Sequence, residues 1–150
     1  MHTYTSRPWA SLITAAALSM AAVTGITACS SSSPAASSSE AATGAHLSAT
    51  DFSTAMKAPG TVVLDVRTPA EFAAGHLPNA KNIDIEGPDF ASGIAALDKK
   101  GTYAVYCRSG NRSATAMEQM TAASFTQVYD LAGGIGAWQS MGGPMTMGNP

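Results

Sequence analysis

The sequence predicts an α/β fold, a small, mostly parallel central sheet flanked by helices, preceded by a signal segment and a disordered linker. Short apolar runs rich in β-branched residues are typical of strands buried on both faces, and TVVLDV at residues 61–66 and TYAVYC at residues 102–107 are such runs. Segments with helical character alternate with these runs, as in parallel sheets. The part that carries the pattern, residues 46–144, has about 100 residues, a normal size for one hydrophobic core.

The individual elements follow from local signals. PAEFAAG at residues 69–75 has a proline where the first helical turn tolerates one and a glycine near the end. Residues 90–99 place Phe90, Ile94 and Leu97 on one helical face. The sequence therefore predicts strands at 61–66, 81–85, 102–107 and 128–131, and helices at 69–75, 90–99, 113–123 and 133–141.

Composition excludes some classes of partner. Charged residues make up 12% of the chain, against about 25% in an average domain. The formal net charge is −2 and no basic stripe is present, so the chain does not have the composition of a nucleic-acid-binding protein. The three histidines, at positions 2, 46 and 76, are scattered and lack metal-ligand spacing, so no metal site is predicted.

The first 28 residues have the pattern of an export signal. A thinly charged start precedes an apolar, small-residue stretch from Ala10 to Ala28. Residues 26–29, Ile-Thr-Ala-Cys, resemble the lipobox of bacterial lipoproteins, which implies a signal peptide over residues 1–28 and a lipid on Cys29. The expected location is then the outer face of the bacterial cell membrane. A plain signal peptide or an uncleaved membrane anchor also fits the apolar stretch, and all three place the remaining chain outside that membrane.

Two further segments are expected to lie outside the folded core. Residues 29–45 are rich in serine and alanine and lack large apolar side chains, which is typical of a flexible linker. Residues 145–150 are expected to be a short tail.

The loop after the third predicted strand carries the candidate chemistry. Cys107 ends the strand, and Gly110 and Asn111 tolerate backbone angles that let successive N–H groups turn inward. A helix N-terminus and two arginines, at 108 and 112, add positive charge, which favours a nucleophilic thiolate. If Cys29 carries lipid, Cys107 has no disulfide partner. A Cys29–Cys107 disulfide and a buried structural cysteine are the alternatives.

Three segments resemble the rhodanese-like sulfurtransferases. They are LDVRTPAEFAAGHLPNAKNI at residues 64–83, YCRSGNRSATA at 106–116 and LAGGIGAW at 131–138, in the order of that family, and the resemblance spans about residues 47–142. It implies one rhodanese-like domain in which Cys107 carries sulfur as a persulfide. The donor would be thiosulfate or a similar small sulfur-containing anion, and the acceptor a thiol or cyanide. The resemblance implies no metal or organic cofactor.

Site residues are predicted on this basis. Cys107 is the catalytic residue, and the candidates for donor and persulfide binding are Arg108, Ser109, Gly110, Asn111, Arg112, Ser113 and Arg67. Asp65 and Glu71 are expected to support the site, since either could pair with Arg67, and Glu71 lies four positions beyond it, a spacing that joins residues on one helical face. His76 is interpreted as a hydrogen-bonded turn residue, and Gly133 to Gly136 as a turn into the last helix.

Two other functions remain open from the sequence. Phosphatases and arsenate reductases related to this fold use a longer loop, with arginine six positions after the cysteine. Here that position is Ser113, and the second arginine is Arg112, at the fifth. A shorter loop makes a smaller cradle, which favours a single sulfur atom. The second alternative is a non-catalytic module that carries sulfur or docks a partner.

Overall fold

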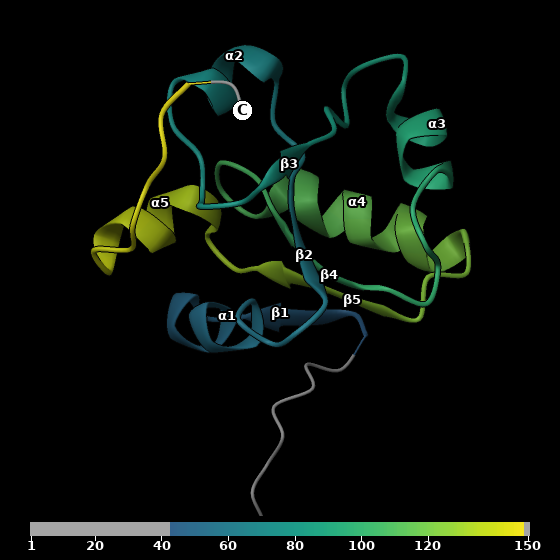
Figure 1. The fold of residues 1–150 in the computed structure, drawn as a ribbon, viewed down its shortest axis with the longest axis horizontal. Helices are drawn as coiled ribbons and strands as arrows, with labels where there is room; N and C mark the ends of the chain where they lie inside the picture. Colours follow the sequence, from purple (N-terminus) through teal and green to yellow (C-terminus); the bar gives the residue numbers. More distant parts are fainter. Residues whose placement is uncertain (1–42, 149–150) are drawn as a thin grey trace, which may run out of the picture. The chain divides into compact units, whose positions relative to one another are not determined.

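A five-stranded parallel sheet with helices on both faces forms the domain, as seen in the computed structural model, which describes residues 43–148 (Figure 1). The strand order is β1-β5-β4-β2-β3. The elements in chain order are β1 (Ala45–Leu47), α1 (Ala49–Ala55), β2 (Thr61–Asp65), α2 (Pro69–Ala73), β3 (Lys81–Asn82), α3 (Phe90–Ala95), β4 (Thr102–Tyr106), α4 (Asn111–Ala122), β5 (Gln127–Leu131) and α5 (Gly134–Ser140).

The predicted fold class is confirmed, and the four expected strands and four expected helices are present. The sequence prediction missed β1 and α1. β1 has only three residues, and α1, with the sequence ATDFSTA, has one large apolar side chain, Phe52, so neither shows a periodic pattern. Ser48 nonetheless caps α1, because its side chain accepts a hydrogen bond from the Asp51 amide.

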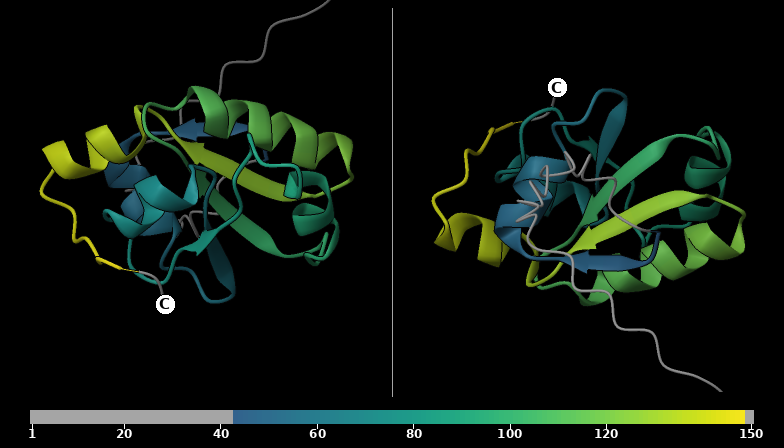
Figure 2. Two further views of the ribbon diagram at one scale, coloured as in Figure 1. Left: turned by 90° about the horizontal axis from the view of Figure 1, so that it is seen from above. Right: turned by 90° about the horizontal axis from the view of Figure 1, so that it is seen from below.

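Alternation along the strands divides the core into two layers. Ala104 and Tyr106 of β4 pack in one cluster with residues of α1 and α5. Tyr103, Val105 and Cys107 pack in the other cluster, with residues of α3 and α4. Figure 2 shows α4 and α1 on opposite sides of the sheet. The thiol of Cys107 therefore belongs to the α4 side.

The carboxyl ends of the parallel strands form one edge of the sheet. Arg67 follows β2, Cys107 follows β4, and Gly133 and Gly134 follow β5. In open parallel sheets this edge is where ligands bind. Within residues 43–148, no helix combines the length and the apolar character that a membrane span requires.

Ordered contacts extend past both predicted ends of the folded domain, residues 46 and 144. Ordered pairing begins before residue 46, because the Gly44 amide donates to the Val128 carbonyl and β1 starts at Ala45. At the other end, Thr146 exchanges two hydrogen bonds of 2.8 Å with His76, and the Gly148 amide donates to Ala73. Residues 145–148, expected as a tail, thus pack on the domain. The predicted signal peptide, the Cys29 lipidation site and most of the linker lie outside the described residues.

Candidate active site

Cys107 lies directly after β4 under a tight turn. Its side chain is 1% exposed, and it is a free thiol in the part of the chain that the structure describes. The Gly110 amide donates a hydrogen bond to its sulfur at 3.1 Å. Gly110 has a φ of 102°, a conformation that residues other than glycine rarely adopt, and it is the residue from which the chain enters α4. The sulfur thus packs against the core on one side and meets a hydrogen-bond donor on the other.

Helix α4 begins immediately after this turn. The first amides of a helix have no intrahelical acceptor and concentrate partial positive charge there. Asn111 opens α4 and is exposed, whereas Ser113, in the same turn, is fully buried. The turn therefore places a hydrogen-bond donor on the sulfur, and the start of a helix follows directly after it.

Helix α5 fixes the other side of the cysteine turn. The Ile135 amide donates to the Cys107 carbonyl at 2.8 Å, and the Gly136 amide donates to the Arg108 carbonyl at 3.4 Å. Gly134 lies so close that a Cβ atom there would sit 2.4 Å from the Cys107 carbonyl oxygen. The GGIG segment is the predicted turn into the last helix, and it is also a backbone clamp on the cysteine turn, a role that the sequence prediction missed.

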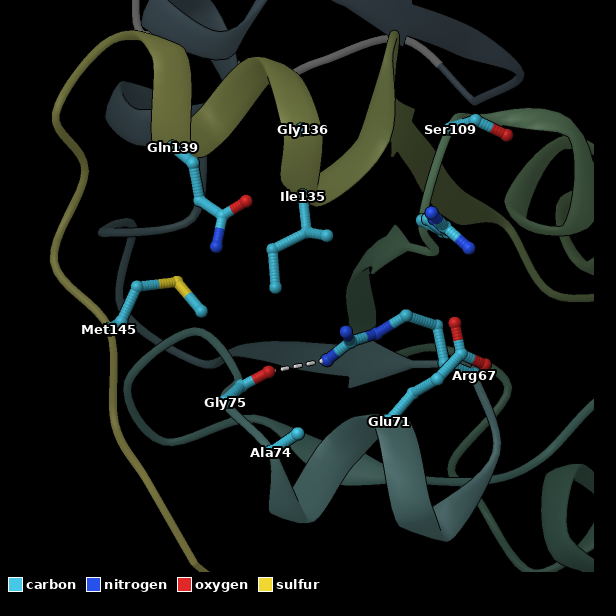
Figure 3. Close-up of a pocket in the computed structure, with 10 residues that line it drawn as sticks. Arg67, Glu71, Ala74, Gly75, Ser109, Ile135, Gly136, Gln139 and Met145 are labelled. Carbon is cyan, nitrogen blue, oxygen red and sulfur yellow. Dashed lines mark hydrogen bonds between the residues drawn. The ribbon is translucent and has the colours of Figure 1, made fainter.

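A cavity of about 540 Å³ opens beside the turn (Figure 3). Three predicted residues line it, Arg67, Arg108 and Ser109, and so does the supporting residue Glu71. The remaining wall comes from Ala74, Gly75, Ile135, Gly136, Gln139 and Met145. Figure 3 shows Gln139 and Met145 pointing into the cavity from α5 and the segment after it. Gln139 and Met145 lie outside the sequence motifs, because only the fold brings these two residues to the cavity.

Arg67 is a buried part of the cavity wall. It is 5% exposed, and its Nε donates to both carboxylate oxygens of Asp65, at 2.9 and 3.0 Å. Its Nη2 also donates to the Gly75 carbonyl at 2.8 Å, as drawn in Figure 3. Burial by itself would lower the pKa of Arg67, but the hydrogen bonds and charge of Asp65 raise it. Of the two partners expected for Arg67, the structure selects Asp65, which fixes the loop after β2.

Arg112 joins α4 to α2 and does not line the cavity. Its two terminal nitrogens donate to the two oxygens of Glu71, each at 2.9 Å, and Nη1 also donates to Glu86 at 2.9 Å. Glu71, the other partner considered for Arg67, thus pairs with Arg112. Arg67 precedes α2, whose N-cap is Thr68, so Arg67 and Glu71 do not share a helical face. The hydrogen bond from Arg112 is the main reason that the pKa of Glu71 is lowered to about 2.

Two turn residues can be compared with their predicted roles. The ring of His76 is buried, lies 3.0 Å from the Phe72 carbonyl through Nδ1 and stacks on the Phe72 ring, as expected of a hydrogen-bonded turn residue. It is not part of the cavity lining. Ser113, predicted in the persulfide loop, bonds to the buried carboxylate of Asp130 at 2.8 Å instead of facing the cavity.

Comparison with known proteins finds a matching family profile, similar sequences and similar solved structures. The sequence profile described as "Rhodanese-like domain" matches residues 48–141. The chain is 36% identical to the thiosulfate sulfurtransferase GlpE of Stutzerimonas stutzeri over 57% of this chain and 76% of that protein. It is 37% identical to the enzyme of the same name from Pseudomonas aeruginosa, over 55% and 73%. A crystal structure of a rhodanese-related protein from Thermoplasma volcanium aligns with a TM-score of 0.62 and 33% identity, covering 69% of this chain and 98% of that one.

The clamp predicts a large cost for a methyl group at position 134. Gly134→Ala should lower the free energy of unfolding by about 3 kcal/mol or more, because the methyl group collides with the Cys107 backbone. Gly142→Ala is the matched control, since Gly142 also has a positive φ but a Cβ atom there would meet no other atom within 4 Å, and it should cost about 1 kcal/mol. Denaturant unfolding measures both, and equal costs would contradict the clamp.

The Arg112–Glu71 pair predicts a pH-dependent contribution to stability. Because the folded-state pKa of Glu71 is lowered from 4.5 to about 2, the contribution is present above pH 4.5 and is lost as the pH falls to about 2. Glu71→Gln keeps a capping side chain but removes the charge, and should destabilise the domain at neutral pH by about 1 kcal/mol after solvent screening.

Urea unfolding of both proteins between pH 7 and pH 2 measures this difference, which should shrink toward the acid end. Glu86→Gln, which removes the more exposed partner of Arg112, serves as the control and should have the smaller effect. A Glu71→Gln difference that stayed constant with pH would show that the pair contributes nothing through its charge.

Proposed function

Because this chain belongs to the rhodanese-like domain family, we propose that it is a sulfurtransferase that moves a sulfane sulfur from thiosulfate, or a similar donor, to a thiophilic acceptor through a persulfide on Cys107. The observation that carries the proposal is the Gly110 amide, which donates to the Cys107 sulfur at the start of α4. The 36% identity to a thiosulfate sulfurtransferase supports it.

The first half-reaction is a displacement at sulfur. The Cys107 thiolate attacks the outer sulfur of thiosulfate, the bond between the two thiosulfate sulfurs breaks, and sulfite leaves with the bonding electron pair. A persulfide anion remains on Cys107. The attack needs no general base once the thiolate has formed, and the helix start and the Gly110 amide favour that ionised state.

The second half-reaction returns the enzyme to its thiolate. A nucleophile, cyanide in an assay or a thiol, attacks the outer sulfur of the persulfide, and the sulfur–sulfur bond breaks with its electrons returning to Cys107. Cys107 itself does not line the cavity of about 540 Å³, but the next two residues, Arg108 and Ser109, do, so the acceptor would approach the sulfur from that side of the turn. The Arg108 lining of the cavity attracts the anionic donor as well.

The direct test is thiocyanate formation from thiosulfate and cyanide by the purified full chain. The wild type should turn over by ping-pong kinetics, and Cys107→Ser should lose at least about three orders of magnitude in kcat because it removes the nucleophile. Cys29→Ser, which alters the other cysteine of the chain, is the control and should keep the activity. A wild type that makes no thiocyanate but hydrolyses an aryl phosphate would replace this proposal with phosphatase chemistry.

Substitutions of the two loop arginines should have different effects, one on the KM for the donor and the other on stability. Arg108 makes no ion pair within residues 43–148 and lines the cavity, whereas Arg112 is held by two carboxylates. Arg108→Gln should raise the KM for thiosulfate roughly tenfold and the KM for an uncharged sulfane donor much less. Arg112→Gln should mainly lower stability. Equal effects of Arg108→Gln on both donors would leave Arg108 without a role in anion binding.

We also propose that Cys29 carries a lipid that anchors the domain at the outer face of the cell membrane. The proposal is supported by the apolar leader and by the Ile-Thr-Ala-Cys sequence at residues 26–29. Expression of the full chain in a bacterium, followed by mass analysis of the mature N-terminus, should find an acylated cysteine as residue one. An unmodified N-terminus, or Cys29→Ser protein that fractionates with membranes as the wild type does, would contradict the anchor.

A further inference from the structure

A series of close polar contacts runs from the surface to the cysteine turn through residues that do not line the cavity. His46, on β1, contacts Asp130 of the neighbouring β5, with Nδ1 and Oδ1 2.6 Å apart. The second oxygen of Asp130 lies 2.8 Å from the Ser113 hydroxyl. That hydroxyl lies 2.9 Å from the carbonyl of Gly110, whose amide donates to the Cys107 sulfur. Four contacts therefore join an exposed histidine to the reactive sulfur.

Burial differs sharply between the two ends of this series of contacts. The side chain of Asp130 is 1% exposed, while that of His46 is 58% exposed. A buried carboxylate that stays ionised needs a partner, because desolvation penalises an isolated charge. An ionised carboxylate only accepts hydrogen bonds, so Nδ1 of His46 carries a hydrogen in this contact. A His46 ring that carries hydrogens on both nitrogens places a positive charge opposite the negative charge of Asp130.

The Ser113 hydroxyl has one hydrogen and two acceptors beside it. The ionised carboxylate is the stronger acceptor, so the hydroxyl donates to Asp130. The Gly110 carbonyl remains satisfied, because the Ala114 amide donates to it at 3.0 Å. Asp130 thereby ties the first turn of α4 to β5.

We infer that His46 and Asp130 are positioning residues for the cysteine turn: Asp130 holds Ser113 and the start of α4, and His46 in its protonated form supplies a positive charge that offsets this buried carboxylate's effect on a negatively charged sulfur. The inference rests on the proposed role of Cys107 as a nucleophile. It assigns to β1, which was not expected from the sequence, a part in setting the reactivity of a residue on another strand.

The charged surroundings of His46 are few. Asp130 faces it from β5, and Glu118 of α4 lines the same surface hollow, with Gly44, Met117, Thr121 and Ala122 completing that hollow. Glu118 makes no ion pair within the described residues. It therefore provides a matched control, an acidic residue near His46 that does not belong to the series of contacts.

The test measures the ionisation of Cys107 through its reaction with iodoacetamide, an uncharged reagent. The full-length protein is treated at a series of pH values, and the initial rate of modification of the Cys107 peptide is followed by mass spectrometry, which separates it from Cys29. His46→Gln should move the pH of half-maximal rate upward by about 0.5 unit, which corresponds to an about threefold slower reaction on the acid side. His46→Lys, which retains a positive charge, should restore the wild-type value, and Glu118→Gln should not change it.

Asp130→Asn should move the same midpoint downward. A purely structural role would instead shift it in the same direction for His46→Gln and Asp130→Asn, so opposite signs are the decisive result. A His46→Gln midpoint equal to that of the wild type, or a His46→Lys midpoint equal to that of His46→Gln, would overturn the inference. Since alkylation requires no sulfur transfer, these midpoints test the inference even in a protein that makes no thiocyanate, the outcome that would remove only the proposed function.

Discussion

The geometry of this site depends on how the backbone holds the turn from Cys107 to Gly110. The Gly110 amide donates to the sulfur, and the left-handed conformation of Gly110 lets the chain enter α4 directly after this amide. The turn cannot relax outward, since the start of α5 packs against it and donates to the Cys107 carbonyl. A glycine at position 134 is the condition for that approach, because a Cβ atom there would overlap the cysteine backbone. Two glycines far apart in the sequence thus place one reactive sulfur.

The carboxylates that support the turn each pair with a basic side chain. Asp65 pairs with Arg67, Glu71 with Arg112, and Asp130 with His46. Each pair joins two elements or fixes a loop at the carboxyl edge of the sheet. Arg108, at the cavity wall, makes no such pair within residues 43–148. The basic side chains that pair with carboxylates are therefore distinct from Arg108, which lines the cavity. The positive charge of Arg108 favours anionic substrates and a thiolate at the cavity.

Local patterns in the sequence were sufficient for the parts of this molecule that depend on local chemistry. The buried strands, the alternation with helices and the cysteine loop are visible in runs of a few residues. The partner of Arg112 could not be identified in this way, because Glu71 and Arg112 are 41 positions apart and meet only when the fold brings α2 near α4. The same reason hid Gln139 and Met145 in the cavity wall and the contact of His46 with Asp130. The sequence analysis did not predict β1, because a strand of three residues shows no hydrophobic periodicity, although β1 forms an edge of the sheet that supports the site.

A cysteine turn that holds a negatively charged sulfur should accept one further sulfur atom and keep it. Mass analysis of the Cys107 peptide after incubation with thiosulfate alone and removal of excess reagent tests this most directly. We expect a stable gain of one sulfur atom on that peptide, with one equivalent of sulfite released and with the gain reversed by cyanide. An unchanged mass, or a gain that corresponds to a sulfonate in place of a single sulfur, would contradict it.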